Sequence, residues 1–153
     1  WQRARDGSGA LMAAYLKMET FLENVGNKLI DFFGTTDTYR AVIHTDAPVA
    51  ATDNAVSDWT QIGGSNGYTT GGENITYNAT RTGGTITSTA VDVVWTATGG
   101  NLGSSTTGRY FGDYDDTTAG ANVMCDFDYG SPFKGATGET MTMDFGASLN
   151  TWA

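Results

Sequence analysis

The chain has 153 residues and a formal net charge of −9, which is long enough for one domain with a buried core. Charged residues make up only 16% of it and aromatic residues 12%, which excludes a highly charged disordered protein. The eight basic residues form no stripe for nucleic acid, and no apolar run reaches the roughly 20 residues that span a membrane.

Residues 1–11 differ in composition from the rest of the chain, and we interpret them as an N-terminal arm. They lack the apolar segment of a secretory signal and precede Met12, which resembles a natural start. An extension upstream of the domain is the simpler interpretation. The alternative is that a neighbouring subunit holds the arm, since polar Gly/Ser segments are ordered only when something binds them.

The spacing of apolar residues then predicts an amphipathic helix over residues 12–34, ending at Gly34. Steps of four and three residues place on one face Leu11, Tyr15, Met18, Leu22, Val25, Leu29 and Phe32. This stripe favours packing against the domain's own sheet. Its breadth and its coiled-coil-like spacing also fit an interface with another subunit, so these residues are the candidate interface.

From residue 35 onward, short alternating segments separated by Gly-rich turns predict a single β-domain that extends to residue 153. The clearest strand lies at residues 91–97 and ends at Gly99-Gly100, and a hairpin is expected around Thr82-Gly83-Gly84. The other strands are expected at residues 38–44, 59–62, 74–81, 85–90, 109–113, 123–129, 139–145 and 148–152.

The strand spacing predicts a mainly β fold, an antiparallel β-sandwich or jelly-roll-like barrel with one N-terminal amphipathic α-helix. The residues expected in its core are Val91, Val93, Trp95, Phe127 and Phe145.

The sequence offers no catalytic constellation. Gly63-Gly64-Ser65-Asn66-Gly67 matches the pattern of a nucleophile elbow, but a second Gly-rich turn comes directly after it, so the segment is predicted to be a turn. His44 is the only histidine, and we expect it exposed or capped at a strand end. Asp126 and Asp128 predict a solvated strand face, with Cys125 on the opposite side as a buried structural thiol.

Two binding hypotheses remain open beside the favoured interpretation, which has no metal and no cofactor. Asp113, Asp115 and Asp116 lack the glycine and glutamate of an EF-hand loop, yet Ca²⁺ also accepts irregular sets of oxygen ligands. The candidates for a sugar-stacking platform are Tyr68, Tyr110, Tyr114 and Trp152.

Six blocks occur in a fixed order along the chain: TYRAVI with Ala47-Pro48, NGYTTGG, DVVWTATGG, RYFGDYDDT, DFDYG and GETMTMDF. Together they resemble a family of small virion structural proteins of tailed bacteriophages, described as head decoration or minor structural proteins. The resemblance covers residues 35–146. It does not extend to the predicted helix or to the arm.

This resemblance implies a non-enzymatic β-rich protein present in many copies on the virion. Within it we favour a capsid decoration (cement) protein on the outer shell. Its partners would be the major capsid protein and sibling copies of itself, with neither nucleic acid nor membrane. The alternative is a tail or fibre protein that binds host glycans. The resemblance brings no catalytic residues.

Overall fold

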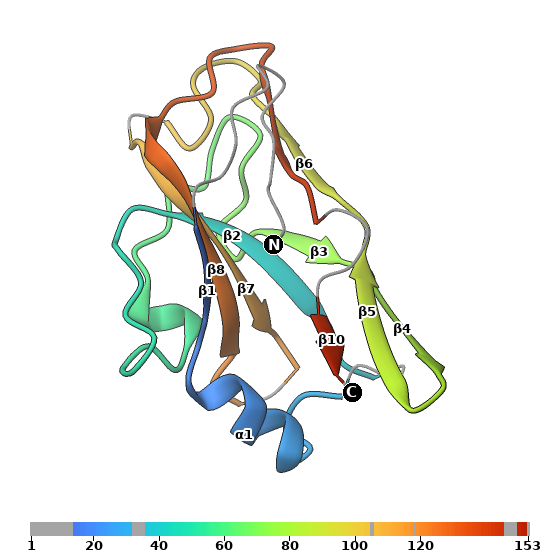
Figure 1. Ribbon diagram of the computed structural model, residues 1–153. Coiled ribbons are helices and arrows are strands. Elements are labelled where there is room, and N and C mark those ends of the chain that lie inside the picture. Colours follow the sequence, from blue (N-terminus) through green and yellow to red (C-terminus); the bar gives the residue numbers. More distant parts are fainter. Residues whose placement is uncertain (1–13, 32–35, 105, 118, 146–149, 153) are drawn as a thin grey trace.

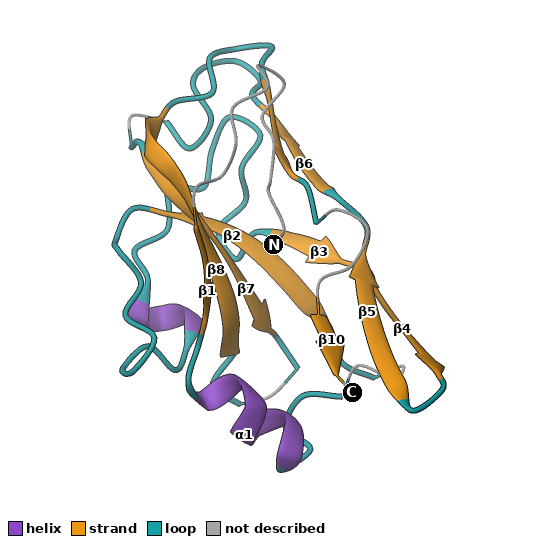
Figure 2. Ribbon diagram, viewed as in Figure 1, coloured by secondary structure: helices purple, strands orange, loops and turns teal. Residues whose placement is uncertain are grey.

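The computed structural model describes residues 14–31, 36–104, 106–117, 119–145 and 150–152. The predicted arm, Leu11, Phe32 and Gly34 lie outside these residues. The described chain is mainly antiparallel β-structure with one α-helix, as the sequence predicts (Figure 1, Figure 2).

The largest sheet has five strands, and all of its pairings are antiparallel. In spatial order they are β1 (Ala14–Lys17), β8 (Asn122–Phe133), β7 (Gly108–Asp115), β2 (Tyr39–His44) and β3 (Glu73–Ile75). The register places Phe111 of β7 opposite both Phe127 of β8 and Ile43 of β2. This row of apolar side chains marks the inner face of the sheet.

Two smaller sheets form a second layer over the inner face (Figure 1). One has the order β10 (Asn150–Trp152), β5 (Thr85–Ala90) and β4 (Tyr77–Thr82), and the other pairs β6 (Val93–Thr96) with β9 (Thr140–Met143). Aromatic rings join the layers, with Trp95 5.8 Å from Phe111 and Phe127 6.4 Å from Phe145 between centroids. The arrangement is β-sandwich-like.

The core contains four of the five residues that the sequence predicts there: Val93, Trp95, Phe127 and Phe145 are buried. The prediction is wrong for Val91, whose side chain is 58% exposed. The N–H of Val91 donates to the carbonyl of Thr76, which extends the β4–β5 ladder by one residue, while β6 begins only at Val93. Val91 therefore belongs to the end of the hairpin and not to the strand that carries Trp95.

The predicted helix over residues 12–34 is wrong at its N-terminal part, because residues 14–17 form the edge strand β1. Tyr15 pairs with Phe127 of β8, and their ring centroids lie 5.3 Å apart. The periodicity of apolar residues could not reveal this pairing, since the partner strand is far away in the sequence. Tertiary pairing here outweighs the local pattern.

The helix α1 (Thr20–Gly26) is short and ends well before Gly34. Its last turn closes in a Schellman motif: Lys28 has φ 58°, its N–H donates to the carbonyl of Val25, and the N–H of Leu29 donates to that of Asn24. Gly26 and Asn27 favour such an end because both are weak helix formers.

Candidate functional site

The outer face of the five-stranded sheet buries a histidine–aspartate pair. His44 of β2 and Asp126 of β8 are both fully buried, and Nε2 of the imidazole lies 2.5 Å from Oδ2 of the carboxyl group. Strand β7 runs between them, and Gly112 stands opposite Asp126. Because Gly112 has no side chain, the two groups meet across this strand.

Trp59 covers the histidine–aspartate pair from the loop after β2. Its ring stacks on His44 at a centroid distance of 4.5 Å and an interplanar angle of 5°, and its Nε1 donates to Asp53. A Cβ at Gly112 would lie 2.1 Å from the Trp59 ring, so only glycine permits this cover. The strand predicted at residues 59–62 is wrong. In this segment only Gln61 forms a β-bridge, and its partner is His44 of β2.

The chemistry of the pair is that of a buried structural contact. Burial raises the pKa of Asp126 to about 6, although the hydrogen bond with His44 acts in the opposite direction. Within the described residues, Nδ1 of His44 and Oδ1 of Asp126 have no hydrogen-bond partner. A hydrolytic triad needs a nucleophile within hydrogen-bond reach of the second ring nitrogen, and the described chain places none there.

A second buried carboxyl group lies on the inner face. Oδ2 of Asp113 accepts hydrogen bonds from the Tyr77 hydroxyl at 2.8 Å and from the Cys125 thiol at 3.3 Å, while Oδ1 has no partner among the described residues. Burial raises the pKa of Asp113 to about 7, against the lowering effect of these two hydrogen bonds. Cys125 is buried, as the sequence predicts.

Asp128 ends the acidic row of β8 at the protein surface. It accepts two hydrogen bonds from Arg109, each 2.9 Å long, and these hydrogen bonds lower the pKa of its carboxyl group. Arg109 also lies over the ring of Tyr110, 5.1 Å from its centroid. The row therefore passes from a buried carboxyl at Asp126 to a paired, partly exposed one at Asp128.

The sequence-based expectations for His44 and for Asp126 are wrong. An exposed or capped histidine and a solvated aspartate are predicted, yet both side chains are buried. No local signal could reveal the pair, because the two residues are far apart in sequence and their cover, Trp59, comes from a loop. Gly112 signals a close approach on β7 but does not identify the residues that meet there.

The Ca²⁺ hypothesis finds no support in the described part of the chain, which contains no group of three or more His, Cys, Asp or Glu side chains that could hold a metal ion. Asp113 and Asp115 are buried on β7. Asp116 is exposed, and its carboxylate lies 3.4 Å from the Arg40 guanidinium.

The sugar-stacking platform is wrong for its three tyrosines, because Tyr68, Tyr110 and Tyr114 are buried. Tyr68 packs inside, and its hydroxyl contacts Gln61 and the backbone of Ile43. The side chain of Trp152 lies outside the described residues. The segment around Ser65 is a turn, as predicted, with Asn66 at φ 54° and Gly67 at φ 96°.

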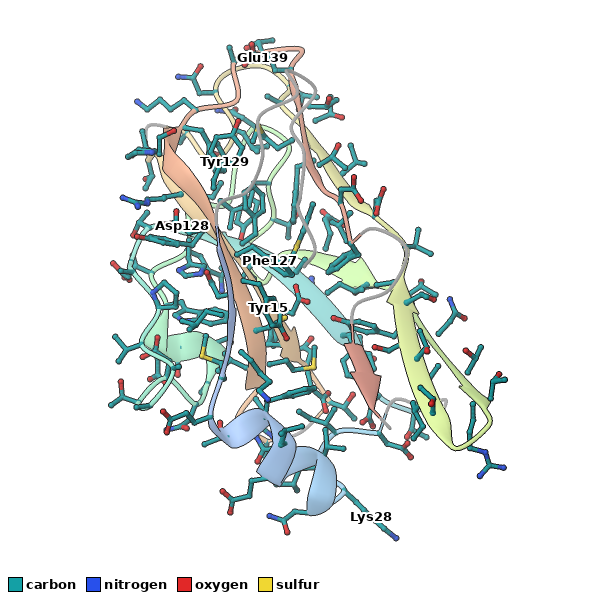
Figure 3. All side chains as sticks on the ribbon, viewed as in Figure 1. Tyr15, Lys28, Phe127, Asp128, Tyr129 and Glu139 are labelled. Carbon is teal, nitrogen blue, oxygen red and sulfur yellow. The ribbon has the colours of Figure 1, made fainter. Side chains whose placement is uncertain are left out.

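The predicted interface stripe separates into buried and exposed members. Met18 is buried and Val25 is partly buried against the core, whereas Leu22 is 46% and Leu29 43% exposed. Tyr15 is 39% exposed and lies beside Phe127, while Lys28 projects from the far end of α1 (Figure 3). The exposed apolar side chains of α1 and the residues after it are the candidate interaction surface.

The loop before Trp59 contacts the start of α1. The carbonyl of Ala50 accepts a hydrogen bond from the N–H of Glu19, which brings the neighbouring Val49 to the start of α1. Val49 is 51% exposed. We refer to Leu22, Leu29 and Val49 together as the α1 surface.

Comparison of the chain with protein-family models, with curated proteins and with solved structures finds no match. Within the described residues, no helix is long and apolar enough to cross a membrane.

Proposed function

We propose that this chain is a non-enzymatic structural protein of a bacteriophage virion, a capsid decoration (cement) protein that binds the outer shell. The observation that carries the proposal is the division of the chain into two parts. The blocks that resemble the virion family coincide with β2, β6, β7, β8 and β9 and with the turn around buried Tyr68. These blocks form the scaffold.

Leu22 and Leu29 of the α1 surface lie outside residues 35–146, the region that resembles the virion family, and this supports the role of the surface as the attachment site. Leucine and valine side chains that are about half exposed contribute binding energy when a partner covers them. A shell that buries them in many copies is stabilised by mass action on the assembled state. Attachment to the major capsid protein is therefore assigned to this surface.

The test is binding to capsids that lack the protein, measured as bound copies per capsid after sedimentation. The double variant Leu22→Glu/Leu29→Glu should reduce occupancy by about tenfold or more, because carboxylates replace two apolar contacts. Val94→Glu is the matched control. Val94 is 53% exposed on β6, which Figure 1 shows at the opposite end from α1.

Unchanged occupancy of the double variant, or equal loss in the Val94→Glu control, would contradict the attachment site. The location of the protein is tested separately by electron cryomicroscopy of the virion. Copies in icosahedral register support the decoration role. Copies restricted to the tail support the alternative of a tail or fibre protein, for which the buried tyrosines supply no glycan platform.

A further inference from the structure

Among the described strands, none pairs with the outer edge of β4. Strand β4 has six residues and is the outer strand of the sheet β10-β5-β4, whereas the other edge strands have three or four. Figure 1 shows it at the margin of the molecule. Proteins usually protect such edges with lysine, proline, a bulge or a covering segment. The only charged residue of β4 is Arg81.

The backbone groups at this edge follow from the hairpin turn. Gly83 and Gly84 have φ 58° and 86°, the signature of a type I′ turn, in which the flanking pair Thr82–Thr85 is hydrogen-bonded. Hydrogen bonds to β5 then recur at every second residue of β4. The bond from Val91 N–H to the Thr76 carbonyl has the same phase.

Every second residue of β4 therefore directs its backbone groups away from β5. Ala79 and Arg81 lie between the hydrogen-bonded positions, so their N–H and C=O groups point to the open edge. Six residues without proline or a register shift form a regular template for another strand.

The charge distribution selects the partner. The whole chain has a net charge of −9, but residues 74–91 contain Arg81 and no acidic residue. A second copy can approach this hairpin without bringing carboxylates together, which is the main obstacle to self-association in an acidic protein. One face of the hairpin carries the uncharged side chains of Asn78, Thr80, Thr87 and Thr89.

We propose that two copies of this chain associate by antiparallel pairing of their β4 strands about a twofold axis at Thr80. Ala79 of each copy lies opposite Arg81 of the other, and each such pair exchanges both of its N–H···O=C bonds. The two outer sheets become one continuous sheet. This association does not rest on capsid attachment, so either proposal can fail without the other.

The first test is sedimentation velocity of the full chain over a range of micromolar concentrations. Arg81→Pro removes one outward N–H and leaves the bonds to β5 in place, and Arg81→Ala is the matched control that keeps the N–H. Wild type and Arg81→Ala should dimerise. Arg81→Pro should weaken dimerisation by about tenfold or more, because the twofold axis removes two hydrogen bonds at once.

The second test places a charge at the twofold axis. It tests the dimer independently, even if the Arg81→Pro variant does not fold. Thr80→Glu brings two carboxylates face to face in the dimer and should shift the chain to monomer. Thr87→Glu adds the same charge on the same face of β5, away from the axis, and should leave the dimer intact. A monomeric wild type, or a Thr80→Glu variant that dimerises like wild type, would overturn the proposal.

Discussion

Several polar and ionisable side chains are buried in this protein. Asp113 and Asp126 belong to neighbouring strands but occupy opposite faces of one sheet, and each is fully buried. Asp126 meets an imidazole, whereas Asp113 meets a hydroxyl and a thiol as hydrogen-bond donors. A buried carboxyl group without a cationic partner is held more easily in its neutral form.

We expect the protein to be more stable at mildly acidic than at alkaline pH. Asp113 has a folded pKa of about 7 against an ordinary value of 3.8, so between these values the folded chain binds more protons than the unfolded one. The free energy of unfolding therefore falls as the pH rises from about 4 to 7. From pH 5 to pH 8 Asp113 alone should contribute a loss of about 2–3 kcal/mol, measured by urea unfolding.

Substitution identifies the responsible group. Asp113→Asn resembles the neutral acid and should flatten most of this pH dependence, leaving the smaller part due to Asp126, whose pKa is also raised. Asp116→Asn changes an exposed carboxylate and should leave the profile as in wild type. A steep profile that persists in Asp113→Asn would contradict the assignment.

At the scale of elements, the side chains of β6 alternate between buried and exposed along the strand. Val91, Val93 and Trp95 share one phase in the sequence, but only the last two are buried, because β6 starts at Val93. The preceding residue, Asp92, uses its carboxylate to accept the N–H of Phe145. Val91, before this contact, is therefore exposed, whereas Val93, after it, is buried.

We expect two truncations within this segment to differ in cost. Trp95→Ala removes a fully buried side chain that packs on Phe111 and Tyr68 and should lower the free energy of unfolding by roughly 3–5 kcal/mol. Val91→Ala changes an exposed side chain and should stay within about 0.5 kcal/mol of wild type. Equal losses in urea unfolding would show that the two positions share one environment.

At the scale of the whole molecule, the N-terminal segment from residue 14 onward is part of the body and not an appendage to it. β1 completes the edge of the five-stranded sheet, and Met18, Phe21 and Ile30 are buried in the common core. The division predicted from the sequence, a helix over residues 12–34 and a separate β-domain from residue 35, implies that the helical region could be removed while the β-domain stays folded. The structure makes this expectation untenable, because the removal would expose the edge of β8 and open the core.

We therefore expect deletion of residues 1–31 to lower the midpoint of thermal unfolding strongly or to prevent folding, since three large core side chains are lost at once. Deletion of residues 1–11, which keeps β1 and α1, is the comparison variant. The measurement is thermal unfolding detected by far-ultraviolet circular dichroism. A stable, cooperatively folded product of the longer deletion would show that β1 and α1 are dispensable.

The amino-acid sequence by itself determined the mainly β class, the hairpin at Gly83-Gly84, the strand that carries Trp95 and the burial of Phe127 and Phe145. These features depend on neighbours in the chain: alternation with period two, β-branched residues and turn-forming glycines. The sequence predicts β4 as a strand, but only the order of strands in the sheet shows that β4 lies at an edge.

The tertiary structure alone decided the fate of residues 14–31 and of the buried polar groups. A stripe with spacings of three and four residues predicts a helix until β8 offers Tyr15 a partner, and the sequence around Asp126 predicts a solvated carboxylate until His44 and Trp59 close over it. Both outcomes depend on contacts between distant segments, and their free energy outweighs local propensity. Sequence patterns show the local propensity, but they do not show which distant segments come into contact.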